Sequence, residues 1–146
     1  MDQSLTDQIF MIRNTLESFT KSDFSSRTSF YSCSGFPKGC CGDTADLLGL
    51  YFDKYHNIDS IYVTWVGLPR NPNASHAWLL VENEIIDITA DQFNEYGYNL
   101  ASVIITTTSD FHNSFNNIKK SKFRADSLNQ TGIPSVLSKV MKNILG

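Results

Sequence analysis

Residues 41–56 constrain the fold of this chain more than any other segment. Their apolar side chains lie on most sides of a helix rather than on one: Ala45, Leu47, Leu48, Leu50, Tyr51, Phe52 and Tyr55. A helix that is apolar nearly all round has no face for water and is buried between other elements. We therefore expect a domain in which further helices and strands pack around this segment.

The size of the chain fits one domain over residues 1–146. Hydrophobic residues make up 41% of the sequence, enough for a core, and the net charge of −3 does not favour nucleic acid as a partner. The first residues contain neither a basic start nor an apolar run, and no stretch has the length to span a bilayer. We expect a soluble, cytoplasmic protein without a membrane span, and its oligomeric state stays open.

Amphipathic helices are expected at both ends of the chain. An apolar stripe with spacings of three and four predicts a helix over residues 4–20, with Ser4 and Asp7 marking its start. A similar stripe predicts a closing helix over residues 136–145. Ser, Gly and Pro between residues 21 and 39 predict an irregular loop.

Strands dominate the middle of the chain, where β-branched and aromatic residues cluster. Residues 67–75 and 111–134 interrupt them and are expected to be mainly loop. Helices followed by antiparallel strands indicate an α+β fold. The predicted strands are residues 61–66, 76–81, 84–89 and 103–107.

One predicted hairpin brings a histidine and an aspartate together. Its arms flank Glu82-Asn83, which predicts a turn at these residues. In that register Trp78 faces Asp87, so His76 and Asp87 are diagonal neighbours on one face, about 7–8 Å apart at the backbone. Asp87 could therefore hold the His76 ring and fix its tautomer.

The three cysteines do not have the pattern of a disulfide scaffold, since their number is odd in a chain of this length. Cys41 stands at the first position of the predicted buried helix, where unpaired N–H groups and partial positive charge stabilise a thiolate and an oxyanion. Gly42 has no side chain, so a substrate could approach Cys41 closely. Cys40 is better interpreted as a packing residue.

A thiolate nucleophile needs a base and a group that orients the base. His76 and Asp87 supply these two roles if the hairpin forms as predicted. His112 is the alternative: it could line the cleft, or replace His76 as the base if the hairpin is wrong.

Three short motifs occur in order within residues 36–93. They are Gly39-Cys40-Cys41-Gly42-Asp43-Thr44-Ala45, His76-Ala77-Trp78 and Asp87-Ile88-Thr89. They resemble the nucleophile motif, the His-Ala-Trp strand and the Asp-x-Thr of the transglutaminase-like superfamily. The longer strings at residues 36–39 and 86–93 look like small bacterial members of that superfamily.

The resemblance implies a papain-like core, in which a central helix carrying the Cys packs on an antiparallel sheet that carries the His and Asp. It selects Cys41 over Cys40, because the motif counts two residues from Gly39. It also implies an enzyme, a cysteine hydrolase or acyl transferase that attacks an amide of a protein or peptide substrate through a Cys-His-Asp triad. No acidic cluster resembles the calcium sites of animal transglutaminases, so no metal or other cofactor is expected.

Substrate contacts are expected from Gly42, Trp65 and Trp78. Relatives complete their oxyanion hole with a Gln or an aromatic side chain, and Tyr31 and Trp65 are the candidates in this sequence.

Two other functions stay open. The chain could be a catalytically silent papain-like module that binds a protein partner, since a fold does not fix a function. It could also hold a metal with Cys33, Cys40 or Cys41 and His76, although this spacing is poor for zinc.

Two polar segments have no assigned role. Asp91 and Gln92 could contact substrate or form a turn. A basic cluster could be merely solvated, or could bind an acidic partner or a membrane surface. Its members are Lys119, Lys120, Lys122 and Arg124.

Overall fold

The computed structural model describes all 146 residues as an α+β protein with helices packed on a five-stranded antiparallel sheet. The helices are α1 (Gln3–Ser18), α2 (Ser29–Ser32), α3 (Cys41–His56), α4 (Asp110–Asn113) and α5 (Ile133–Leu145). The 3₁₀ helices are η1 (Lys21–Asp23), η2 (Ala90–Tyr96) and η3 (Ala125–Leu128). The strands are β1 (Ile61–Leu68), β2 (Asn71–Val81), β3 (Glu84–Asp87), β4 (Ile104–Thr106) and β5 (Asn117–Lys122).

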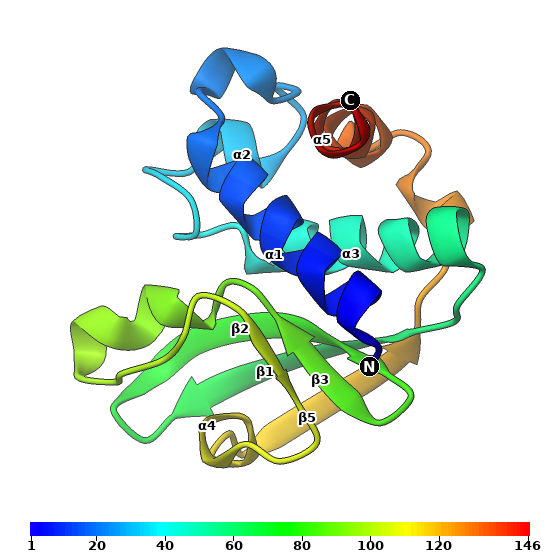
Figure 1. Cartoon of the computed structure of the whole chain (residues 1–146). Helices are drawn as coiled ribbons and strands as arrows, with labels where there is room; N and C mark the ends of the chain where they lie inside the picture. Colours follow the sequence, from blue (N-terminus) through cyan, green and yellow to red (C-terminus); the bar gives the residue numbers. More distant parts are fainter.

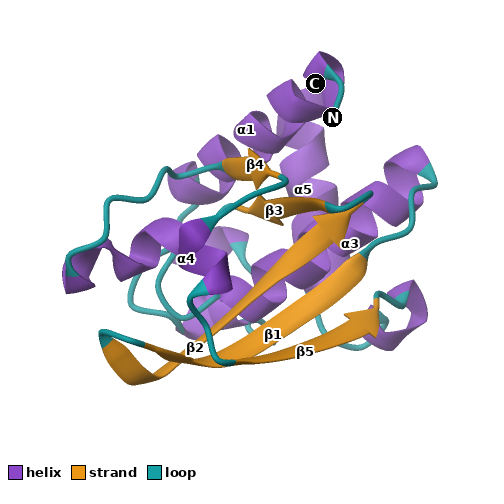
Figure 2. Cartoon of the chain, turned by 90° about the horizontal axis from the view of Figure 1, so that it is seen from below, coloured by secondary structure: helices purple, strands orange, loops and turns teal.

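The sheet has the strand order β4-β3-β2-β1-β5, and every pair is antiparallel. Helices α1, α3 and α5 lie on one face of it (Figure 1). The short helix α4 lies on the opposite face, in front of the strands when the molecule is seen from below (Figure 2). None of the helices combines the length and the apolarity needed to cross a membrane.

The central element is α3, as the sequence predicts. Leu47, Tyr51 and Phe52 on this helix are completely buried. The helix packs between the sheet below it and α5 beside it. It ends at Asn57, whose left-handed backbone (φ 53°) lets its N–H reach back to the carbonyl of Asp53. The same buried helix therefore fixes the position of Cys41, its first residue.

Strand β2 separates two apolar layers by the alternation of its side chains. Ala77 and Leu79 belong to the layer shared with α1, α3 and α5. Trp78 belongs to a second layer on the opposite face, together with Trp65 and Phe111. Because both faces are covered, β2 is buried along most of its length.

The two loops expected at residues 67–75 and 111–134 are corrected by the structure. The first shrinks to a turn at residues 69–70, and β2 begins at Asn71. The second contains α4, η3 and the edge strand β5, which has no buried side chain and so lacks the apolar signal of a strand. Phe123 anchors the end of β5 on α3: a Cβ at Gly49 would lie 2.5 Å from the Phe123 ring.

The helices at both ends were predicted with small errors at their starts. Asp2, rather than Ser4, caps α1 and accepts a hydrogen bond from the N–H of Leu5 at 2.9 Å. Helix α5 begins at Ile133, before the predicted residue 136, with Pro134 in its first turn.

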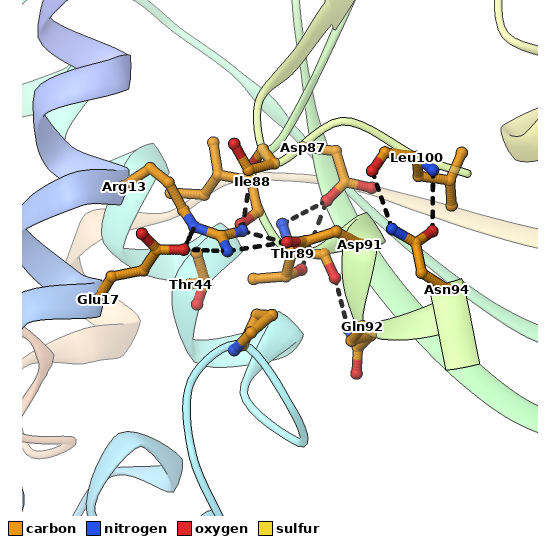
Figure 3. A network of polar contacts seen from close by, with 12 residues as sticks. Arg13, Glu17, Thr44, Asp87, Ile88, Thr89, Asp91, Gln92, Asn94 and Leu100 are labelled. Carbon is orange, nitrogen blue, oxygen red and sulfur yellow. Dashed lines mark hydrogen bonds and ion pairs between the residues drawn. The ribbon is translucent and has the colours of Figure 1, made fainter. Parts of the chain in front are cut away.

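A buried arginine ties α1 to the segment that follows β3. Arg13 is 2% exposed, and its guanidinium donates to Asp91 at 2.8 Å and to the carbonyls of Ile88 and Ser102 at 2.6 and 3.1 Å. It also pairs with the half-exposed Glu17 (Figure 3). Asp91, for which the sequence left open a substrate contact or a turn, thus lies in η2 and forms an ion pair.

Replacement of Arg13 by Met should lower the free energy of unfolding by about 3–5 kcal/mol, because it leaves the carboxylate of Asp91, the buried carbonyl of Ile88 and the partly buried carbonyl of Ser102 without their partner. Urea denaturation measures the change. Glu17→Gln is the matched control, since it removes the exposed partner and should cost about 1 kcal/mol or less. Equal effects of the two variants would contradict this assignment.

Candidate functional site

A cleft of about 520 Å³ opens beside the start of α3 and contains both Cys41 and His76 in its wall. The sheet supplies most of the rest of the wall, from β1, β2 and β5. The other lining residues are Gly42, Tyr62, Thr64, Trp65, Val66, Ser75, Ala77, Asn117 and Lys119. Cys41 and His76 are thus brought to one cavity from segments far apart in the sequence.

Cys41 begins α3 and is partly exposed. No side chain caps this helix, so N–H groups of its first turn are not taken up by a capping residue. At Gly42 a Cβ would lie 3.2 Å from the Tyr62 hydroxyl, so the glycine leaves room for Tyr62 beside the thiol. This end of α3 therefore offers a thiol, backbone donors and a phenol at one place.

Cys40 has the opposite character from Cys41. Its side chain is completely buried and its thiol donates to the carbonyl of Pro37 at 3.3 Å. Burial raises the pKa of Cys40 far above the ordinary thiol range, and the neighbouring Cys33 adds to the effect. All three cysteines are free, and Cys40 is a packing residue.

His76 and Asp87 are in direct contact, as the predicted hairpin requires. The observed pairs Val81–Glu84 and Leu79–Ile86 have the predicted register. Nε2 of His76 donates to Oδ2 of Asp87 at 2.6 Å, and both side chains are at most 1% exposed. The other ring nitrogen, Nδ1, is buried and has no hydrogen-bond partner.

The charges of this pair stabilise each other. Burial alone would lower the pKa of His76, but the charge of Asp87, its hydrogen bond and the nearby Cys41 thiol raise it above the usual value. Burial alone would raise the pKa of Asp87, but His76 and His112 hold it well below the usual carboxyl range. Asp87 is therefore ionised at neutral pH, and it favours an imidazolium at His76.

His112 is a second donor to the same carboxylate oxygen. Its Nε2 lies 2.7 Å from Oδ2 of Asp87, and its Nδ1 lies 2.6 Å from Oγ of Ser109, which caps α4. From its sequence, His112 was a candidate to line the cleft or to replace His76, but it lies behind Asp87 and does not line the cleft of Cys41. Nothing in the sequence pairs it with Asp87, because α4 approaches β3 only through tertiary packing.

The remaining oxygen of Asp87 is held by the backbone that follows it. Oδ1 accepts from the N–H of Thr89 at 3.0 Å and from its hydroxyl at 3.4 Å. Gln92, in the next turn, donates to the Thr89 carbonyl at 3.0 Å (Figure 3). Its side-chain oxygen accepts from the Gly39 N–H at 3.4 Å. Gln92 therefore links the segment after Asp87 to the loop before Cys41.

One buried cluster has donor types that suit a metal. Donor atoms of His76, Asp87 and His112 lie within 4.8 Å of one another. Both imidazole Nε2 atoms, however, point at a single carboxylate oxygen at hydrogen-bond distance, which requires them to carry protons. A metal here would have to displace both of these protons, and without one the three side chains form a hydrogen-bonded chain.

The two predicted tryptophan contacts have different positions. Trp65 is 2% exposed and is one of the residues that line the cleft, although its side chain packs in the second apolar layer. Trp78 is 4% exposed, packs 4.6 Å from the His112 ring and does not line the cleft. Tyr31 also lies away from it, next to Cys33 and Phe36. Tyr62 was missed, because an aromatic residue in a strand is usually a core residue.

The fold and the site together define an α+β protein with a cysteine cleft beside a buried His–Asp–His chain. No protein-family model, no curated protein and no solved structure matches the chain. Its relation to the transglutaminase-like superfamily thus stays a prediction from the three motifs.

Replacement of His112 by Phe should move the titration of His76 to higher pH. Loss of one donor leaves the charge of Asp87 less compensated, so the carboxylate stabilises the His76 imidazolium more strongly. NMR of ¹³C-labelled histidine measures the titration. His112→Gln keeps an N–H donor and should restore most of the wild-type value; if the Gln and Phe variants titrate alike, the hydrogen bond is not the cause.

The stabilising effect of Asp87 should depend on pH in two directions. The lowered pKa of Asp87 gives a contribution to folding stability. It is fully present above the pKa of an unfolded aspartate, about 3.9, and is lost as pH falls below that value. The raised pKa of His76 gives a second stabilising contribution. It is fully present below the pKa of an unfolded histidine, about 6.5, and is lost as pH rises through the pKa of His76 in the folded protein. The stability difference between wild type and Asp87→Asn should therefore be largest between pH of about 4 and 6.5; a flat difference across pH 3–9 in urea titrations would contradict an ionised pair.

Proposed function

We propose that this protein is a cysteine-dependent hydrolase or acyl transferase that acts on an amide, either a peptide bond or a Gln side chain. The observation that carries the proposal is the His76 ring: Asp87 holds its Nε2, while its Nδ1 has no partner and Cys41 lies in the same cleft. A papain-like core is the arrangement that this geometry and the sequence motifs fit best.

The reaction has two steps. His76 takes the proton of the Cys41 thiol, and the thiolate attacks the carbonyl carbon. The C–N bond then breaks, His76 returns the proton to the leaving amine or ammonia, and a thioester remains on Cys41. Attack by water regenerates the thiol and releases an acid, whereas attack by an amine releases a new amide.

Two kinds of donor could stabilise the oxyanion of the tetrahedral intermediate. The first is the set of backbone N–H groups at the start of α3. The second is the Tyr62 hydroxyl beside Gly42, because burial, together with Asp46 and Cys41, raises the pKa of Tyr62 and keeps the phenol protonated. Tyr62 thus takes the place of the Gln or aromatic side chain of the relatives.

The pH dependence of alkylation tests the pair of Cys41 and His76. With iodoacetamide at pH of about 6, where an ordinary thiol of pKa about 8.5 is almost fully protonated, Cys41 should react readily. His76→Ala should slow it by about tenfold or more, because the thiolate loses its counter-ion. Mass spectrometry of tryptic peptides assigns the rate to each cysteine.

Cys33 is the internal control in the same digest. It is partly exposed and lies outside the cleft, so His76→Ala should leave its rate unchanged. If Cys41 and Cys33 respond alike, there is no activated pair, and the silent binding module becomes the better proposal. If the pair is active, release of ammonia from a library of Gln peptides, abolished by Cys41→Ala, identifies the reaction.

A further inference from the structure

We propose that the cleft takes a peptide segment with a carboxylate next to the reacting amide, and that Lys119 recognises this carboxylate. The inference names a substrate class for the site and therefore rests on the function proposed above.

Strand β5 divides its lysines between the two faces of the sheet. Lys119 lies opposite Thr64 of β1, and both residues line the cleft of Cys41. Lys120 lies opposite Val63, whose side chain belongs to the second apolar layer. Lys120 lines a separate hollow beside His112 on that face. Only Lys119 of this pair therefore belongs to the cleft.

The charge of Lys119 is not neutralised by the protein. It takes part in none of the ion pairs of the structure. No Asp or Glu lines the cleft. Asp43, in the first turn of α3, accepts instead from the N–H and hydroxyl of Ser29 at 2.7 and 2.9 Å. Apart from the Cys41 thiolate, no acidic side chain lines the cleft with this ammonium group, so a ligand carboxylate has no internal ion pair to displace.

Basic residues are concentrated along β5 and just after it. The chain carries a net charge of −3, yet four of its twelve basic residues lie between positions 119 and 124. Lys119 is the one of these four that lines the cleft, because Lys120 and Lys122 line a separate pocket with Asp59 and Glu82, and Arg124 pairs with Asp126. Lys119 therefore supplies the positive charge that attracts an acidic ligand at the cleft itself.

Lysines on an edge strand also prevent it from pairing with other chains. That role would apply equally to Lys119 and Lys120, because both lie on β5. Recognition in the cleft applies to Lys119 alone. The two residues therefore form a matched pair of variants that separates the two explanations.

Two alkylating reagents of nearly equal size measure the charge felt at Cys41. Iodoacetate is an anion and iodoacetamide is neutral. The rate with iodoacetate divided by the rate with iodoacetamide at Cys41 therefore reports the local electrostatic potential. At pH of about 9 an accessible thiol ionises without help from His76. At an ionic strength of about 0.01 M, Lys119→Met should lower the ratio by about threefold, and about 1 M salt should remove the difference.

Lys120→Met should leave that ratio at the wild-type value. Equal changes in the two variants, or none in Lys119→Met, would overturn the inference. Failure of the function proposed above has a different signature, the loss of His76-dependent reactivity at low pH, and the ratio can be measured in either case.

Protection of Cys41 from iodoacetamide tests the substrate class directly. A blocked peptide with the sequence Asp-Gln-Asp should protect Cys41 better than its Asn-Gln-Asn counterpart, and Lys119→Met should abolish the preference. Inorganic phosphate is the control for charge alone. Equal protection by phosphate and by the acidic peptide would overturn the peptide assignment.

Discussion

The carboxylate of Asp87 is ionised in a part of the molecule that water does not reach, and the site is arranged around this one charge. A buried carboxylate is stable only where several donors compensate for lost hydration. Four do so here: the two imidazoles of His76 and His112, and the backbone and hydroxyl of Thr89. These donors come from three segments, so α4, β2 and the residues after β3 must all be in place before the charge is satisfied.

The same requirement explains why the layer behind the cleft is rich in aromatic residues. The rings of Phe93 and Trp78 lie 5.0 and 5.5 Å from His76, and Phe111 lies 6.1 Å from it. They exclude water from the hydrogen bond between His76 and Asp87, which strengthens it. Proton transfer at a neighbouring thiol requires an imidazole that is held in place by one nitrogen and has no hydrogen-bond partner at the other. In His76 these are Nε2, bound to Asp87, and the unpartnered Nδ1.

Sequence patterns predicted the elements whose signal is local. The apolar circumference of α3 predicted a buried central helix, and the Glu82-Asn83 turn predicted the register that joins His76 to Asp87. Strand β5 was missed because its stability comes from backbone pairing with β1, and none of its side chains is buried. A strand that lies exposed at the edge of a sheet leaves no period-2 apolar pattern to detect.

The chemistry of the site was harder to predict than its position, for a physical reason. Cys41, His76 and Asp87 could be named because motif and hairpin geometry are local properties of the chain. His112 and Tyr62 act only through neighbours that are distant in sequence: one reaches Asp87 from α4, and the other reaches Gly42 from β1. The residues that tune a charge are selected by the packing around it, so they become visible only when the two layers on either side of β2 are in place.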